Sequence, residues 1–132
     1  MGPNSISKAM SAASQGMGAQ AYRLQIVSEN LSNADTHGYK RKLITFENEL
    51  NRVSGTNTLS VGDVTLDQSQ GDMLFEPNHP LADEDGYVRM SNVDMMIELS
   101  DAREAGRSYD ANLSTFKQAT QMYSSLLSLL RR

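Results

Sequence analysis

The sequence predicts a mainly α protein, in which long N- and C-terminal helices pair as a coiled coil, with a small irregular or β-hairpin middle segment. Apolar residues recur at helical spacing in both terminal parts of the chain, and turn-forming residues and acids crowd the part between them. Only 39% of the 132 residues are hydrophobic, which argues against a large single core. We therefore divide the chain into segments 1–35, 36–90 and 91–132.

The N-terminal helix is predicted from one stripe of residues at alternating steps of four and three. Its members are Ile6, Met10, Ala13, Met17, Gln20, Leu24, Val27, Leu31 and Ala34. The mean period of 3.5 is that of a coiled-coil seam, interrupted by the amide of Gln20. Turn residues follow, and Gly38 can take the left-handed conformation that ends a helix. We expect the helix to stop between Asn33 and Asp35.

The C-terminal helix is predicted from a second stripe, at steps of three, four or seven. Its members are Met95, Ala102, Ala105, Tyr109, Asn112, Phe116, Ala119, Tyr123, Leu126 and Leu130. The amide of Asn112 again interrupts the seam. Ser91 or Asn92 is expected to cap the start of the helix. From Val93 to Leu130 the helix would span 38 residues, which makes a rod of roughly 57 Å.

The middle segment shows short strand patterns separated by glycine and proline. The patterns are Leu59, Val61, Val64 and Leu66, then Met73 to Phe75, and then Tyr87 to Met90. These apolar residues are too few for an independent core, so we expect the segment to be ordered by packing on the helices or on neighbours. Charge also sets it apart. Residues 53–100 carry nine acids and one base (net −8), whereas residues 1–52 and 101–132 each have a net charge of +2.

Residues that usually carry chemistry are sparse. The chain has no cysteine, and its two histidines, His37 and His79, stand in predicted turns with no second ligand at a metal-binding spacing. Phosphate-loop and nucleophile motifs are absent from the sequence. The acidic middle would repel nucleic acid, and no apolar run approaches the length of a membrane span. We expect no catalytic, cofactor or metal site, no nucleic-acid binding and no membrane insertion.

The apolar surface of the two helices is wider than one partner helix can cover. Leu113, Met122 and Leu127 lie off the seam and broaden it. This pattern predicts packing against other chains in a bundle, sheath or filament. A monomeric helical hairpin, with the loop region covering the remaining surface, is the alternative.

Three blocks of sequence resemble one known family. Residues 30–41 read NLSNADTHGYKR and resemble the Asn-x-Ala-Asn-x-x-Thr-x-Gly-Tyr-[Lys/Arg] signature of bacterial flagellar rod and hook proteins. Residues 75–88 read FEPNHPLADEDGYV and are similar to a second block, which narrows the resemblance to proximal rod members of the family. Residues 105–113 read AGRSYDANL and, with Asn92, Val93, Asp94 and Glu98 before them, resemble the C-terminal helix of that family.

This resemblance implies a structural axial protein that is not an enzyme. Many copies would polymerise with other rod proteins into a hollow shaft that crosses the periplasm and carries torque. The chain would be exported by the flagellar type III apparatus without cleavage of a signal peptide. Its other expected partners are a rod-to-ring adaptor and the surrounding rings. The terminal helices would line the inner tube, and segment 36–90 would face outward.

The candidate functional residues are those expected at contacts between subunits. They are Met10, Met17, Leu24, Val27, Leu31, Asn33, Tyr109, Asn112, Phe116, Tyr123, Leu126 and Leu130. Tyr109, Phe116 and Tyr123 are the candidate aromatic anchors, and packing within the chain is their equal alternative. Gly38 and Tyr39 are expected to form a hinge after the first helix. A soluble helical adaptor or export chaperone remains the alternative function, and its helices would be stably folded alone.

Overall fold

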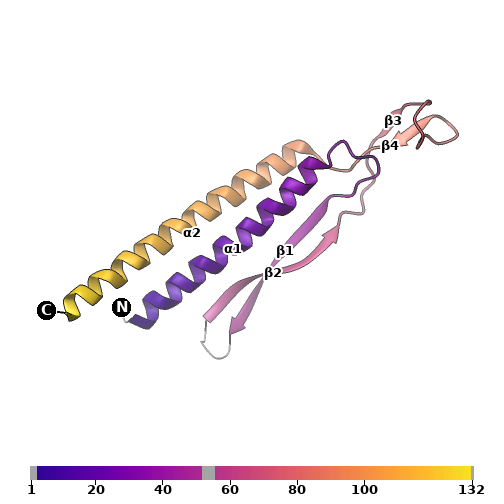
Figure 1. The fold of residues 1–132 in the computed structure, drawn as a ribbon. Coiled ribbons are helices and arrows are strands. Elements are labelled where there is room, and N and C mark those ends of the chain that lie inside the picture. Colours follow the sequence, from indigo (N-terminus) through magenta and orange to yellow (C-terminus); the bar gives the residue numbers. More distant parts are fainter. Residues whose placement is uncertain (1–2, 52–55, 132) are drawn as a thin grey trace.

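The computed structural model describes residues 3–51 and 56–131, so residues 1, 2 and 132 of the predicted terminal segments lie outside the described residues. Its elements are α1 (Pro3–Ser32), β1 (Lys42–Asn51), β2 (Thr56–Leu66), β3 (Met73–Phe75), β4 (Tyr87–Arg89) and α2 (Met95–Leu130). The two helices run antiparallel, with both chain termini at one end of the molecule (Figure 1). The hairpin β1–β2 lies along α1, and β3–β4 extends beyond the opposite end of the helices (Figure 1). The predicted fold class, two long paired helices with a β-hairpin middle, is confirmed.

The buried face of α1 follows the heptad that the sequence predicts. Ile6, Ala13, Gln20 and Val27 stand seven residues apart, and each is between 2% and 8% exposed. Such spacing keeps one face of the helix toward α2 along its whole length. The helix ends at Ser32, close to the predicted stop, and Gly38 in the following turn has a φ of 72°. That left-handed conformation is available to glycine at little steric cost.

The start of α2 differs from the prediction. Asp94 is the N-cap, and its carboxylate accepts a hydrogen bond from the backbone N–H of Met96 at 2.9 Å. The predicted caps are wrong because both are used elsewhere: the Ser91 hydroxyl donates to the carbonyl of Ala34, and Asn92 holds the loop before β1. The helix therefore has 36 residues and is about 54 Å long.

The buried face of α2 also differs from the predicted seam at both ends, because Tyr123 and Leu130 are exposed at the C-terminal end. Ala105 and Ala119 are buried as expected, at 0% and 6% exposure. Met95 is 56% exposed, so its place in the seam was wrong, and Glu98 is the buried residue of that turn. The small alanine side chains let the two helix backbones approach closely.

The hairpin β1–β2 is longer than the short β segment that the sequence predicts. The antiparallel register begins with Lys42 opposite Leu66, and it shifts at a bulge between Ile44 and Phe46. At the bulge, a Cβ on Gly62 would lie 2.5 Å from the Thr45 hydroxyl oxygen, so only glycine fits there without movement. Strand β1 was not predicted. Residues 52–55 between the two strands lie outside the described residues.

The second sheet, β3–β4, nearly matches the two remaining predicted strands. The rings of Phe75 and Tyr87 meet edge to face at 5.2 Å, and Val88 is 1% exposed. The backbone N–H of Gly38 donates to the carbonyl of Arg89 at 3.0 Å, which ties this sheet to the turn after α1. Among the described residues, neither helix has the length and apolar character needed to cross a membrane.

Candidate assembly interface and its polar anchor

A buried carboxylate joins α2 to the segment that enters the hairpin. Glu98 is 0% exposed, and its Oε1 accepts a hydrogen bond from Arg41 Nε at 2.7 Å. Its Oε2 accepts from Asn30 Nδ2 at 3.3 Å. A charge removed from water in this way is stable only while it is paired and hydrogen-bonded. Glu98 is therefore the residue on which this junction depends.

Asn30 binds the backbone at the start of β1 as a neighbouring strand would. Its Nδ2 donates to the carbonyl of Lys42 at 3.0 Å, and its Oδ1 accepts the Lys42 N–H at 2.8 Å. The same Oδ1 accepts from the Tyr39 hydroxyl at 2.9 Å. Burial raises the pKa of Tyr39 above 10.0, so the phenol stays protonated and donating at neutral pH.

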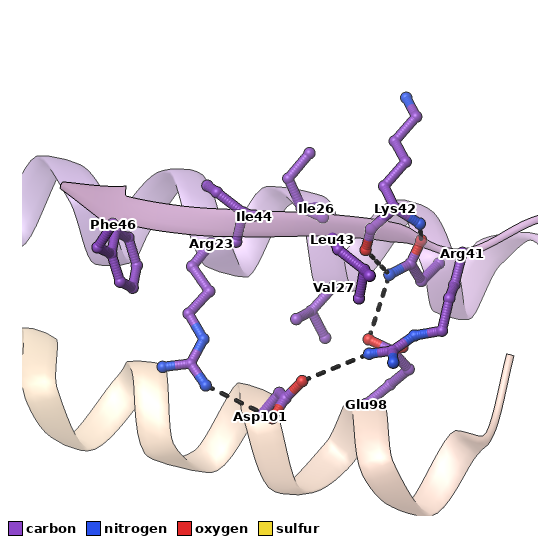
Figure 2. Close-up of a pocket in the computed structure, with 11 residues that line it drawn as sticks. Arg23, Ile26, Val27, Arg41, Lys42, Leu43, Ile44, Phe46, Glu98 and Asp101 are labelled. Atoms are coloured by element: carbon purple, nitrogen blue, oxygen red, sulfur yellow. Dashed lines mark hydrogen bonds and ion pairs between the residues drawn. The ribbon is translucent and has the colours of Figure 1, made fainter. Parts of the chain in front are cut away.

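Arg41 also contacts three further side chains around the junction. Its backbone N–H donates to Asn92 Oδ1 at 2.6 Å, and its guanidinium lies 3.8 Å from Asp67 and 3.6 Å from Asp101. Figure 2 shows Asp101 between Arg23 and Arg41, with Glu98 beside the Arg41 guanidinium. We call Asn30, Tyr39, Arg41, Asn92 and Glu98 the polar anchor. It fixes the base of the hairpin against both helices.

Two further polar contacts lie at the exposed edge of the polar anchor. Lys42 Nζ pairs with Glu29 at 2.7 Å, and this hydrogen bond raises the pKa of Lys42. The backbone N–H of Ser69 donates to Asp67 and holds the pKa of that carboxyl below its usual 3.8. A cavity of about 270 Å³ lies between polar side chains, among them Asn30, Arg41 and Glu98, and apolar side chains of α1 and β1. Its walls are shown in Figure 2.

The sequence contained a signal for Glu98 that the seam analysis passed over. The predicted stripe steps seven residues from Met95 to Ala102, and Glu98 fills the missing position on that face. A carboxylate on an apolar seam needs a partner cation, which a search for buried charge would have sought. Asn30 stands first in the family signature, but its contact with Lys42 could not be predicted, because both partners are backbone atoms.

The predicted hinge residues take different environments. Gly38 is exposed, whereas Tyr39 is half-buried and belongs to the polar anchor. Asn33, predicted at the subunit interface, shapes the end of α1 within the subunit: its Nδ2 donates to the carbonyl of Glu29, and its Oδ1 accepts from the Thr36 hydroxyl. These contacts fix the direction of the chain as it leaves α1.

The other predicted interface residues divide by exposure. Val27 is buried, and Tyr123 and Leu130 are exposed at 43% and 78%. The half-buried members are Met10, Met17, Leu24, Leu31, Tyr109, Asn112, Phe116 and Leu126. Some of this set faces its own chain. A Cβ on Gly16 would meet Asn112 Nδ2 at 2.6 Å, and Leu126 lines a groove with Ile6.

Two apolar patches on α2 are open to solvent. The start patch consists of Met95, Met96, Ile97 and Leu99, which are 43% to 73% exposed. The end patch consists of Tyr123, Leu127, Leu129 and Leu130, which are 38% to 78% exposed. We expect large apolar side chains that are exposed together in one turn of a helix to contact another molecule. Tyr123 and Leu130 of the end patch were predicted at the subunit interface, whereas no residue of the start patch was.

Comparison with protein families identifies the class of protein to which the chain belongs, the flagellar basal body rod proteins. The family model described as flagella basal body rod protein matches residues 9–40. The model described as flagellar basal body rod FlgEFG protein C-terminal matches residues 84–129. The two matched stretches cover most of each antiparallel helix, and Asn30, Tyr39, Asn92 and Glu98 of the polar anchor fall within them.

Individual relatives narrow this class to one protein family. The chain is 41% identical to the flagellar basal-body rod protein FlgC of Agrobacterium fabrum, over 96% of each chain. It is 34% identical to FlgC of Escherichia coli, over 84% of this chain and 87% of the relative, and 32% identical to FlgC of Bacillus subtilis, over 79% and 84%. The chain therefore belongs to the FlgC family of flagellar basal-body rod proteins.

Proposed function

We propose that this chain is a structural subunit of the flagellar proximal rod. It polymerises through its terminal helices into a hollow drive shaft that carries torque. Torque resistance requires many simultaneous contacts along each helix, because isolated exposed ion pairs contribute at most about 1 kcal/mol each. Long amphipathic helices would spread the load over a large buried surface. The polar anchor keeps the hairpin at a fixed direction while the helices bear the load.

The observation that carries this proposal is the pair of open patches at opposite ends of α2. Within the described residues, α2 packs along α1, and the two hairpins leave its start and end uncovered. A subunit that contacts one neighbour through the start patch and another through the end patch would continue the assembly lengthwise. A monomeric adaptor gains nothing from leaving both ends of a long helix apolar.

Different segments of the subunit would face different partners. The terminal helices face the inner tube and contact further copies of this chain and other rod proteins. Segment 36–90, which contains most of the acidic stretch, faces outward, toward the rod-to-ring adaptor and the surrounding rings. The chain reaches this place through the flagellar type III export apparatus, without cleavage of a signal peptide. Its work is mechanical, and no catalytic step is assigned to it.

Isolation of basal bodies separates a rod subunit from an export chaperone. Cells in which the gene is deleted should assemble no hook and should not swim, and an epitope-tagged copy should restore both. The tagged chain should then copurify with basal bodies through detergent and high salt. Recovery of the chain only in the cytoplasmic fraction of motile cells would overturn the assignment in favour of the chaperone.

A further inference from the structure

Three side chains with metal-binding chemistry meet between the turn after α1 and the loop after β3. The imidazole rings of His37 and His79 lie 4.4 Å apart between centroids, and His37 Nε2 lies 3.9 Å from Glu76 Oε2. Donor atoms of the three residues are all within 4.8 Å of one another, and each residue is half-buried. The sequence predicts the two histidines in separate turns. The fold brings them together across more than forty positions of the chain.

The donor set of two imidazoles and one carboxylate suits a divalent transition metal such as zinc. Bonds of about 2.0–2.1 Å in a tetrahedral site place the donor atoms about 3.4 Å apart. The donors here must therefore approach by roughly 0.5 to 1.4 Å. Half-exposed side chains on loops can make this movement by rotation. Glu76 has no competing cation among the described residues except His37.

One hydrogen bond competes with the metal. His79 Nδ1 accepts the backbone N–H of Leu81 at 3.0 Å, so its lone pair is in use. Binding through Nδ1 would replace that hydrogen bond with a metal bond. Binding through Nε2 would move the ring proton to Nδ1 and break the same hydrogen bond. Either route lowers the affinity below that of a preformed site, which predicts micromolar rather than nanomolar binding.

We propose that His37, Glu76 and His79 bind one divalent zinc-class metal ion. The bound ion links the turn after α1 to the loop before β4 and adds a cross-link beside the backbone bond from Gly38 to Arg89. Three protein ligands leave a fourth position for water or for a donor from a neighbouring subunit. The proposal is independent of the rod assignment, because it concerns a site within one chain.

The composition of the chain allows a direct test, because few other residues could bind zinc. The chain has two histidines and no cysteine, so a full-length chain prepared without a histidine tag offers no other imidazole or thiolate. Isothermal titration calorimetry with zinc chloride should show one zinc ion bound per chain, with a micromolar dissociation constant. His37→Gln and His79→Gln should each weaken binding at least tenfold, since each removes one of three ligands. Glu84→Gln, an exposed acid of the same loop outside the cluster, is the matched control and should bind as the original chain does.

Binding of Co²⁺ gives a visible absorption signal that reports the metal site and not the fold of the chain. Co²⁺ bound at the site should give visible absorption bands of a low-symmetry complex, which His37→Gln should abolish while far-ultraviolet circular dichroism stays unchanged. Zinc binding that is equally tight in His37→Gln and His79→Gln would overturn the proposal. Failure of the original chain to bind zinc below about 100 μM would overturn it as well, since the affinity would then be too weak for a specific site.

Discussion

Replacing Glu98 with alanine is expected to lower the free energy of unfolding by about 3–5 kcal/mol. The change leaves the Arg41 guanidinium, whose side chain is 15% exposed, without its 2.7 Å partner. It also removes the acceptor of one Asn30 N–H bond. Urea unfolding of the purified chain, followed by far-ultraviolet circular dichroism, measures the loss. Because the hairpin is then held less firmly against the helices, motility should fall too.

A matched acid on the same helix provides the control. Glu104 also pairs with an arginine, Arg23, at 3.2 Å, but its side chain is 68% exposed. Glu104→Ala should therefore change stability by no more than about 1 kcal/mol. Glu98→Gln should fall between the two alanine variants, since an amide keeps an acceptor for Arg41 but loses the charge. Equal, small effects of Glu98→Ala and Glu104→Ala would show that the polar anchor does not hold the junction.

Placing aspartate in the open patches of α2 should abolish swimming without unfolding the chain. Met96 and Leu130 are 73% and 78% exposed, so Met96→Asp and Leu130→Asp remove little packing within the subunit. In an assembled rod each aspartate would be a buried charge without a partner. Soft-agar swimming and the yield of intact basal bodies measure the effect, and circular dichroism of the purified variants checks the fold.

The apolar variants Met96→Leu and Leu130→Met are the controls for this series. They keep the volume and the character of the patches, so swimming should be near normal. Normal swimming by both aspartate variants would mean that the patches stay in water in the rod. The contacts between subunits would then have to lie on other surfaces of the helices.

Local periodicity made the helices predictable, whereas the junction depends on contacts between distant residues. The seam from Ile6 to Val27 repeats every seven residues, and its burial follows directly from that spacing. Glu98 lies on such a seam, yet its partner Arg41 is 57 positions away, and no local pattern pairs them. Asn30 is the first residue of the family signature, but its partner is the backbone of Lys42, so the identity of residue 42 does not reveal the contact.

Strand β1 and the histidine pair escaped prediction for related reasons. Strand β1 begins at the last residue of a basic cluster, Lys40 to Lys42, which is typical of a solvated turn. The order of the strand comes from pairing with β2 and contact with α1. His37 and His79 come together because two separate turns meet at the end of α1. The open start patch on α2 was missed because the seam was counted from Met95, which faces solvent in the subunit.

Site-specific photo-cross-linking in motile cells tests most directly whether the open patches are contacts between subunits. Benzoylphenylalanine incorporated at position 96 or 130, followed by illumination and basal-body purification, should yield covalent adducts to another copy of this chain or to other rod proteins. The same variants, purified and illuminated at low concentration, should remain monomeric. Absence of adducts from both positions in assembled basal bodies would contradict an assembly built through the two ends of α2.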